Sequence, residues 1–432
     1  MLKIAQVSDL HYSEKNLAES DKCLGFAVDQ AISRGAQIAV VSGDSTDHAL
    51  DVHSPAVEKL ALQIRRLADH CPVLMLQGTF SHEPPGTLSI FPLLSSRHPV
   101  HIVERICQVA LLQSGRWLES EGWRFEAIPQ GAVALFTCIP TVNKAVVAAT
   151  VGAAEAGEAL GKELGALLQG YGPINSAARA ALVPTIGVSH GTVSGCVTEH
   201  GVPMAGFDHE FTTSGLFSAM TQAFMLGHIH RHQAWEEDGR VVAYAGSIGR
   251  FHYGEEGDKG FLMWHVGAAT ARCELVATPA RRTVDLVFAG KPDLAEIERA
   301  ASTQDLDGAF VRVRWSVADE DRHGVDREAI KRALQGAAGV QLEGRVIPVV
   351  RSRAAGISRC ANLHEKVCAW AAVTGVEASA VLGCLEQLAE MTPDEIAQSL
   401  LQERDEDGLA PADSIETMEV LAEQGIAEPS LF

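Results

Sequence analysis

The chain has 432 residues, of which 47% are hydrophobic and 21% are charged, and its formal net charge is −20. The length predicts two or three modules with hydrophobic cores, and the aliphatic content excludes a disordered chain. The charge excludes a generally basic nucleic-acid-binding protein. The acidity is uneven, because residues 354–432 hold 3 Lys and Arg against 15 Asp and Glu, a net charge of −12, which leaves −8 for residues 1–353.

Cysteine usage and hydropathy indicate the compartment. The nine cysteines form no Cys-x-x-Cys pair and several lie in apolar runs, so we expect buried free thiols in a reducing environment. The N-terminus reaches charged residues too early for the core of a signal peptide. The chain contains no run of 18 apolar residues. We therefore expect a cytoplasmic protein without a membrane partner.

Short apolar runs alternate with amphipathic stretches through the first part of the chain. The first predicted strands are residues 2–8, 38–42 and 73–76. Ser20 and Ser54 are predicted to cap the helices between them, since serine is a favourable N-cap and Pro55 suits the first helical position. This β-α-β-α-β order predicts an α/β layered core with buried strands.

Further strands are predicted at residues 133–139, 185–189, 223–226, 241–245 and 260–266. The last of these are closely spaced, so we expect the core to end in antiparallel hairpins. Residues 143–182 are rich in Ala, Gly and Leu and are predicted to form one or two helices.

Three domains are predicted. The α/β core covers residues 1–280, a small α+β module covers 281–353, and an acidic helical segment covers 354–432. The elements expected in the small module are strands at 283–288, 310–317 and 345–350 and a helix at 326–335. In the last segment, Thr392 and Glu395 match a capping box, with Pro393 at the first helical position.

Five of the predicted strands in the core are each followed by Asp, His or both, and in one loop Glu follows the His. The residues are Asp9 and His11, Asp44, His82 and Glu83, His190, and His228 and His230. A single histidine after a strand is most often a surface residue or a satisfied structural one. In layered α/β folds, however, ligands bind outside the carboxyl ends of the strands. Five such loops together predict one shared site.

The residue types in these loops suit divalent cations. Alternate residues of an extended segment point the same way, so Asp9 and His11 can bind one ion together, and His228 and His230 have the same spacing. The carboxylate of Asp44 can bridge two ions. Imidazole and carboxylate ligands without thiolate favour Mn, Fe or Zn. Two such ions can clamp a phosphate and activate water.

These motifs resemble those of the calcineurin-like metallophosphoesterases. The matching segments are Asp9-x-His11, Gly43-Asp44-x-x-Asp47, Gly78 to His82-Glu83, His190, and Gly227-His228-x-His230. The segment from Tyr244 to Phe251, followed by Lys259-Gly260-Phe261, is more specifically similar to the SbcD-type nuclease branch. The resemblance covers about residues 1–280, and the module at 281–353 is similar in placement to the capping domain of that branch.

The resemblance implies two divalent metal ions per chain, with Mn²⁺ expected. Asp9, His11 and His230 would hold the first ion. His190 and His228 would hold the second, and Asp44 would bridge the two.

The resemblance also implies that His82 stabilises the transition state or protonates the leaving oxygen, with Glu83 orienting its ring. The third motif departs from the family pattern. Two extra residues separate Gly78 from His82, and Ser81 stands where the family has an asparagine that binds the second ion. The hydroxyl of Ser81 is a poorer ligand than an amide oxygen, and Thr79 or water is the alternative.

The function implied by the resemblance is that of a DNA nuclease subunit, an exonuclease or endonuclease in DNA end processing or repair. Arg250 would contact a substrate phosphate. The implied partners are DNA and an SMC-like, SbcC-type ATPase that binds the C-terminal helices, with this chain as a homodimer within a heterotetramer. Two alternatives stay open: a small-molecule phosphodiesterase or phosphatase of the same family, and a scaffold subunit with weakened catalysis.

Overall fold

The computed structural model describes residues 1–51, 53–142, 156–204, 211–303, 306, 308–347 and 356–406. The chain divides into two units, Met1–Ile347 and Pro348–Phe432. The first is mixed α/β with several sheets flanked by helices, which confirms the predicted fold class. The proposed domain boundary at residue 280 lies within the first unit, and the one at residue 353 lies outside the described residues.

The first sheet of the core has six strands in the order β13-β12-β1-β2-β3-β4. In that order, their bounds are Ala271–Ala277, Gly260–Val266, Leu2–Val7, Ile38–Val41, Val73–Leu76 and Val100–Val103. Strands β1 to β4 are parallel neighbours, whereas β12 pairs antiparallel with both β1 and β13. The carboxyl ends of β1, β2 and β3 therefore lie at one edge.

The second sheet has seven strands in the order β10-β11-β9-β8-β7-β5-β6. In that order, their bounds are Gln233–Glu237, Arg240–Tyr244, Ala223–Gly227, Thr185–His190, Ala132–Ile139, Cys107–Leu112 and Trp117–Glu119. Strands β7, β8, β9 and β11 are parallel neighbours, and β10–β11 forms a hairpin. The hairpins β10–β11 and β12–β13 confirm the expected antiparallel pairing late in the core.

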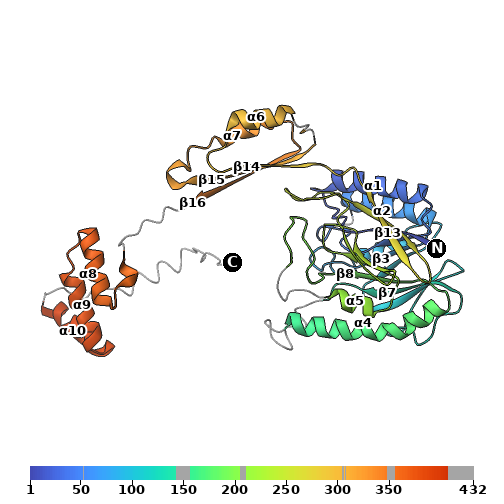
Figure 1. The fold of residues 1–432 in the computed structure, drawn as a ribbon, viewed down its shortest axis with the longest axis horizontal. Helices are drawn as coiled ribbons and strands as arrows, with labels where there is room; N and C mark the ends of the chain where they lie inside the picture. The colour runs from blue at the N-terminus through green and yellow to red at the C-terminus, as the bar shows by residue number, and fades with distance from the viewer. Residues whose placement is uncertain are drawn as a thin grey trace. The chain divides into compact units, whose positions relative to one another are not determined.

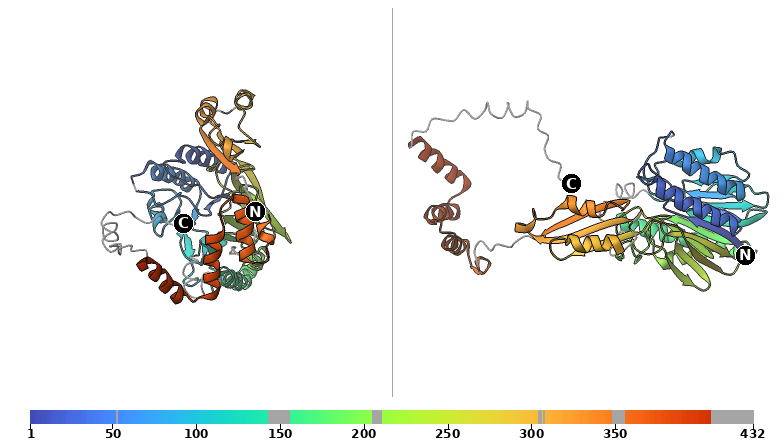
Figure 2. Two further views of the ribbon diagram at one scale, coloured as in Figure 1. Left: turned by 90° about the vertical axis from the view of Figure 1, so that its left-hand side faces the viewer. Right: turned by 90° about the horizontal axis from the view of Figure 1, so that it is seen from above.

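Helices cover the outer faces of the two sheets. Helices α1 (Leu17–Ser33) and α2 (Pro55–His70) lie over the six-stranded sheet, and α4 (Ala156–Ala180) and α5 (Thr213–Ser218) lie over the seven-stranded one (Figure 1). The views in Figure 2 show α1 and α2 side by side along their sheet. A short 3₁₀ helix, Thr87–Leu93, precedes β4.

The main core lies between the two sheets. Ile38 and Leu74 of the first sheet and Phe136 and Ile186 of the second belong to one cluster of fully buried side chains. Separate apolar clusters fill the spaces under α1 and α2 and under α4 and α5. This packing fixes the two sheets against each other, and with them the strand ends that carry the predicted site.

The small module has its own sheet and its own core. Strands β14 (Thr283–Phe288), β15 (Phe310–Ala318) and β16 (Gly339–Ile347) are all parallel, and α6 (Leu294–Thr303) and α7 (Arg327–Ala333) cross between them. Both helices pack on the same face of the sheet (Figure 1). A 3₁₀ turn, Asp319–Asp321, follows β15. The sequence reasoning missed α6.

The second unit contains α8 (Leu363–Thr374), α9 (Ser379–Glu390) and α10 (Pro393–Glu406), after a 3₁₀ turn at Ile357–Arg359. The predicted capping box begins α10, since the backbone N–H of Thr392 donates to the Glu395 carboxylate at 2.8 Å. None of the described side chains in this unit is buried. None of the helices in the described part of the chain is both long and apolar enough to cross a membrane.

Two local predictions were wrong at element boundaries. Helix α1 begins at Leu17 rather than after Ser20, whose hydroxyl instead donates to the Leu10 carbonyl at 2.8 Å. The third strand of the small module was expected at residues 345–350, but β16 begins six residues earlier, at Gly339. Much of its side-chain surface is exposed, so it lacks the apolar run that marks a buried strand.

Candidate metal centre

The five predicted loops meet at the strand ends of the two sheets. Backbone hydrogen bonds join the loop after β1 to the loop after β2, with the N–H groups of Asp9 and Leu10 donating to the carbonyls of Gly43 and Asp44. Asp9, His11, Asp44 and His228 all have positive φ, between 45° and 98°. Non-glycine residues rarely adopt this conformation, so surrounding contacts hold these four residues in place.

Two glycines permit the close approach of these loops. A Cβ on Gly227, at the end of β9, would lie 2.1 Å from the Ser42 carbonyl oxygen and 2.3 Å from the Ser8 hydroxyl. A Cβ on Gly43 would lie 2.2 Å from Nδ1 of His190. No side chain fits at such distances, so both glycines are required for the two sheets to bring their ligands together.

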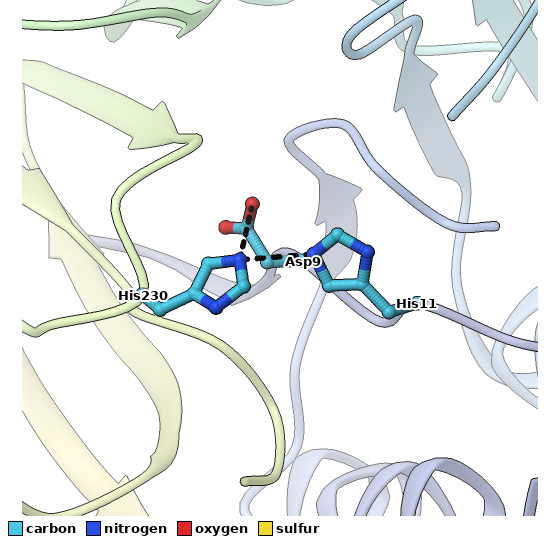
Figure 3. Close-up of side chains that lie close together, drawn as sticks. All are labelled: Asp9, His11 and His230. Carbon is cyan, nitrogen blue, oxygen red and sulfur yellow. Dashed lines mark hydrogen bonds and ion pairs between the residues drawn. The ribbon is translucent and has the colours of Figure 1, made fainter. Parts of the chain in front are cut away.

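The first ligand group consists of Asp9, His11 and His230, whose side chains point toward one another (Figure 3). Nε2 of His11 lies 2.9 Å from Nε2 of His230, and a carboxylate oxygen of Asp9 lies 3.9 Å from the latter. The backbone N–H of His228 donates to both oxygens of Asp9 at 3.0 and 3.2 Å. All three ligand side chains are nearly or fully buried.

The second ligand group consists of Asp44, His190 and His228. Nε2 of His190 lies 3.2 Å from Oδ2 of Asp44, and its Nδ1 donates to the Ser42 carbonyl at 2.8 Å. Burial alone would raise the pKa of Asp44, but the charge of His190 holds it below its ordinary range. Burial would lower the pKa of His190, and Asp44 raises it instead.

Both groups fit divalent cations. Two ring nitrogens bound to one ion at about 2.1 Å with adjacent coordination positions lie about 3.0 Å apart, close to the 2.9 Å between the two Nε2 atoms of His11 and His230. Asp44 also lies within reach of His11 and His82, so it stands between the two groups. Nitrogen and carboxylate ligands without sulfur match the metals expected from the sequence.

The structure places Thr79, rather than Ser81, beside the second group. The Thr79 hydroxyl lies 3.2 Å from Oδ2 of Asp44 and 3.3 Å from Nε2 of His190. Ser81 is exposed. Of the alternatives expected for the family asparagine, the geometry therefore favours Thr79 over Ser81.

His82 lies beside both groups. Its Nδ1 donates to the Asp47 carbonyl at 2.7 Å, and its ring centroid is 4.9 Å from that of His11. The carboxylate of Asp47 is 3.5 Å from Nδ1 of His11 and 3.8 Å from Nδ1 of His82. The backbone carbonyl of Asp47 therefore orients the ring of His82, the role that we had expected of Glu83, and its carboxylate lies near both rings.

Glu83 has a different position from the one expected. Its side chain is fully buried, and its two oxygens accept from the backbone N–H groups of Ser45 and Gly78. Burial, together with the nearby Asp44 carboxylate, raises the pKa of Glu83 to about 7. Glu83 joins the loop after β2 to the loop after β3 and does not face the site, so a catalytic role for it is not supported by this geometry.

Arg250 is also engaged elsewhere. Its guanidinium donates to the backbone carbonyls of Arg281 at 2.8 Å and of Gly257 at 2.5 Å. Its own N–H donates to Glu19 at 3.2 Å, and Glu19 also accepts from the N–H of Arg281 at 2.7 Å. The expected contact with substrate is therefore replaced by contacts that connect the core to the start of the small module.

Sequence reasoning missed one buried ion pair at the site, Lys259 with Glu255. Lys259 was noticed only as part of the segment that resembles the nuclease branch, and Glu255 was not singled out. The available signal was a pair of opposite charges four residues apart after a glycine-rich turn. Exposed surface segments also show this spacing, so it does not identify a buried ion pair.

No protein-family model matches the chain. Over 81 residues it is 36% identical to a Bacillus subtilis (strain 168) protein described as the uncharacterized metallophosphoesterase YhaO, a match of 19% of this chain and 18% of that protein. The chain thus matches less than a fifth of the length of this relative. The match supports a relation to metallophosphoesterases.

Two solved structures align with part of the chain. One is GAP50, the anchor in the inner membrane complex of Plasmodium, with a TM-score of 0.41 and 12% identity over 64% of this chain and 85% of that one. The other is a dimetal phosphatase from Danio rerio, with a TM-score of 0.35 and 11% identity over 63% and 98% of the two chains.

Proposed function

We propose that this protein is a metal-dependent phosphodiesterase that cleaves DNA, a nuclease subunit of the SbcD type with Mn²⁺ as its ion. The observation that carries this proposal is the convergence of two buried ligand groups, with Asp44 between them and His82 beside them. The partial match to a metallophosphoesterase supports hydrolysis of phosphoric esters. The small module and the helical segment favour a macromolecular substrate, since a small one needs neither.

The residues divide the chemical work among themselves. Divalent ions held by the two groups would supply positive charge to a phosphodiester and would activate water. Because Nδ1 of His82 donates to the Asp47 carbonyl, Nε2 is the atom that can hold or release a proton at the leaving oxygen. The carbonyl of Asp47 fixes the orientation of the ring for this transfer.

The test is cleavage of linear duplex DNA by the purified protein with Mn²⁺. We expect cleavage that is lost in Asp44→Ala and in His82→Ala and retained in Ser81→Ala, the matched control on the same loop. DNA that stays intact even when an SMC-like ATPase is added, or a protein that binds no divalent ion, would refute the proposal.

A second candidate, a phosphodiesterase acting on small molecules, is favoured by one observation. A cavity of about 290 Å³ borders the second ligand group, and its lining includes His190 and His228 together with Leu164, Met204 and Phe211. An apolar cavity of this size beside a phosphate site suits a compact organic group attached to the phosphate. Higher turnover on cyclic nucleotides than on duplex DNA would favour this candidate over the nuclease.

We also propose that α8, α9 and α10 bind an SMC-like, SbcC-type ATPase, with this chain as a homodimer within a heterotetramer. Large apolar side chains such as Leu388, Leu400 and Leu401 are exposed on these helices. The net charge of −12 over residues 354–432 disfavours contact with DNA there. Light scattering after mixing the full chain with the ATPase should show the heterotetramer, and Leu388→Asp combined with Leu400→Asp should abolish it.

A further inference from the structure

A buried ion pair lies directly behind the first ligand group. The side chains of Lys259 and Glu255 are both fully buried, and Nζ lies 2.5 Å from Oε2. Nζ also donates to the carbonyl oxygen of His230 at 2.7 Å and to the hydroxyl of Ser247 at 3.0 Å. An ammonium group has three donors, so each of them has an acceptor here.

Glu255 extends this network along the chain. Its Oε1 accepts from the backbone N–H groups of Phe251 and His252 at 3.1 and 2.7 Å. The ion pair therefore holds the segment 246–256 against the carbonyl of His230, with a carboxylate on one side of the ammonium and the peptide of a predicted metal ligand on the other.

The segment held in this way contacts the first ligand group at several points. The ring of Phe251 packs on the rings of His11 and His230, with centroids 5.3 and 6.3 Å away. The ring of His252 stacks on that of His230 at 6.0 Å and an angle of 14°. These three ring contacts all join the segment to the first ligand group.

A lysine is suited to this position. Its three acceptors are the carbonyl of His230 in the loop after β9 and two groups of the segment 246–256, the hydroxyl of Ser247 and the carboxylate of Glu255. A compact ammonium group satisfies acceptors in three directions, whereas the planar fork of arginine favours paired acceptors in one plane. Burying two charges usually costs stability, so stability alone does not explain this ion pair. Because the pair contacts the backbone of a predicted metal ligand, positioning of that ligand explains it better.

We propose that Lys259, together with Glu255, is a positioning residue that sets the orientation of His230 and so tunes the affinity of the first metal ion. The inference rests on the two-ion site of the proposed function. Lys259 contacts the backbone of His230. The carboxylate of Glu255 lies within 4.8 Å of ring nitrogens of His230 and His252 and is paired with the ammonium group of Lys259. Outer partners of metal ligands typically change metal affinity about 10–100-fold when they are removed.

The test is Mn²⁺ binding by the purified full chain, measured by titration and by electron paramagnetic resonance, which separates a coupled pair of ions from a single ion. Wild type is expected to bind two ions and to show the coupled signal. Lys259→Met is expected to weaken one ion at least tenfold and leave the other within twofold, so that the spectrum becomes that of a single ion. Arg240→Met is the matched control, because Arg240 is also buried and donates to the Phe217 carbonyl, but lies at the opposite end of the strands.

Two further variants keep the inference falsifiable if Lys259→Met does not fold. Ser247→Ala removes one neutral acceptor and should weaken the affinity for the same ion several-fold. Glu255→Gln combined with Lys259→Met leaves no unpaired buried charge, and this double variant should again bind one ion. If these variants bind both ions with wild-type affinity, this inference is overturned and the proposed function stands. If wild type itself binds no ion, the proposed function fails.

Discussion

Glu19, at the start of α1, should make a large and pH-dependent contribution to stability. Its side chain is almost fully buried and accepts from the backbone N–H groups of Arg250 and Arg281. It also pairs with Lys22 at 3.0 Å and with the guanidinium of Arg281 at 3.2 Å. Burial would raise the pKa of Glu19, but these donors together hold it below its ordinary range.

We expect Glu19→Gln to lower the free energy of unfolding by about 2–4 kcal/mol at pH 7. Hydrogen bonds to a charged group contribute about 1.5–3 kcal/mol each, and the loss of one partner of a buried ion pair costs about 3–5 kcal/mol. We expect a smaller cost here because Lys22, one of the partners of Glu19, is half exposed. The unit Met1–Ile347 has an unfolding entropy of about 0.7 kcal/mol per degree if it unfolds together. The melting temperature should therefore fall by about 3–5 °C.

The assay is thermal unfolding followed by circular dichroism at pH 7, 5 and 3. Because the folded pKa of Glu19 is depressed, its stabilisation is complete above the ordinary value of about 4.3 and is lost as the pH falls through the folded pKa. The difference between wild type and Glu19→Gln should thus be full at pH 7 and shrink at pH 3. Glu58→Gln, in the exposed first turn of α2, should change stability by less than about 0.5 kcal/mol. A difference that is absent at pH 7, or equal at pH 7 and 3, would refute the reasoning.

Two further predictions concern the metal centre. Gly227→Ala should abolish binding of both metal ions, because the added Cβ would lie 2.1 Å from a backbone oxygen of the facing sheet. Gly122→Ala, with open space around it, should bind both ions. Metal analysis of the purified variants measures both outcomes. Thr79→Val should weaken the affinity for the second ion several-fold, because it removes the hydroxyl 3.2 Å from Asp44. In the same titration, Ser81→Ala should bind this ion with wild-type affinity. Equal effects of the two variants in either comparison would contradict the respective prediction.

The sequence was sufficient for the parts of the site that depend on strand ends. Apolar runs locate β1, β2, β3, β8 and β9, and each has ligands at its last residue or in the next few residues. Because parallel neighbours end at one edge, the meeting of Asp9 and Asp44 follows from topology. The meeting of these residues with His230 needs the face-to-face packing of two sheets, which the order of strands along the chain does not determine by itself.

The residues placed differently from expectation are those whose partners lie far away in the sequence or in an unusual loop. Arg250 donates to the carbonyl of Arg281, 31 residues further along the chain. Glu83 adjoins His82 in the sequence, yet its side chain turns to the backbone of Ser45. The position of Thr79 depends on loop length, since two added residues change which hydroxyl faces Asp44.

The absence of buried side chains in the described part of the second unit has a consequence for how the chain melts. Helices α8 and α9 have 12 residues each and α10 has 14, lengths at which an isolated helix is marginal in water. Without a core to couple them, these helices should lose structure gradually on heating instead of in one step. A broad early decline in helical signal, followed by the sharp transition of the first unit, is the expected melting profile of the full chain.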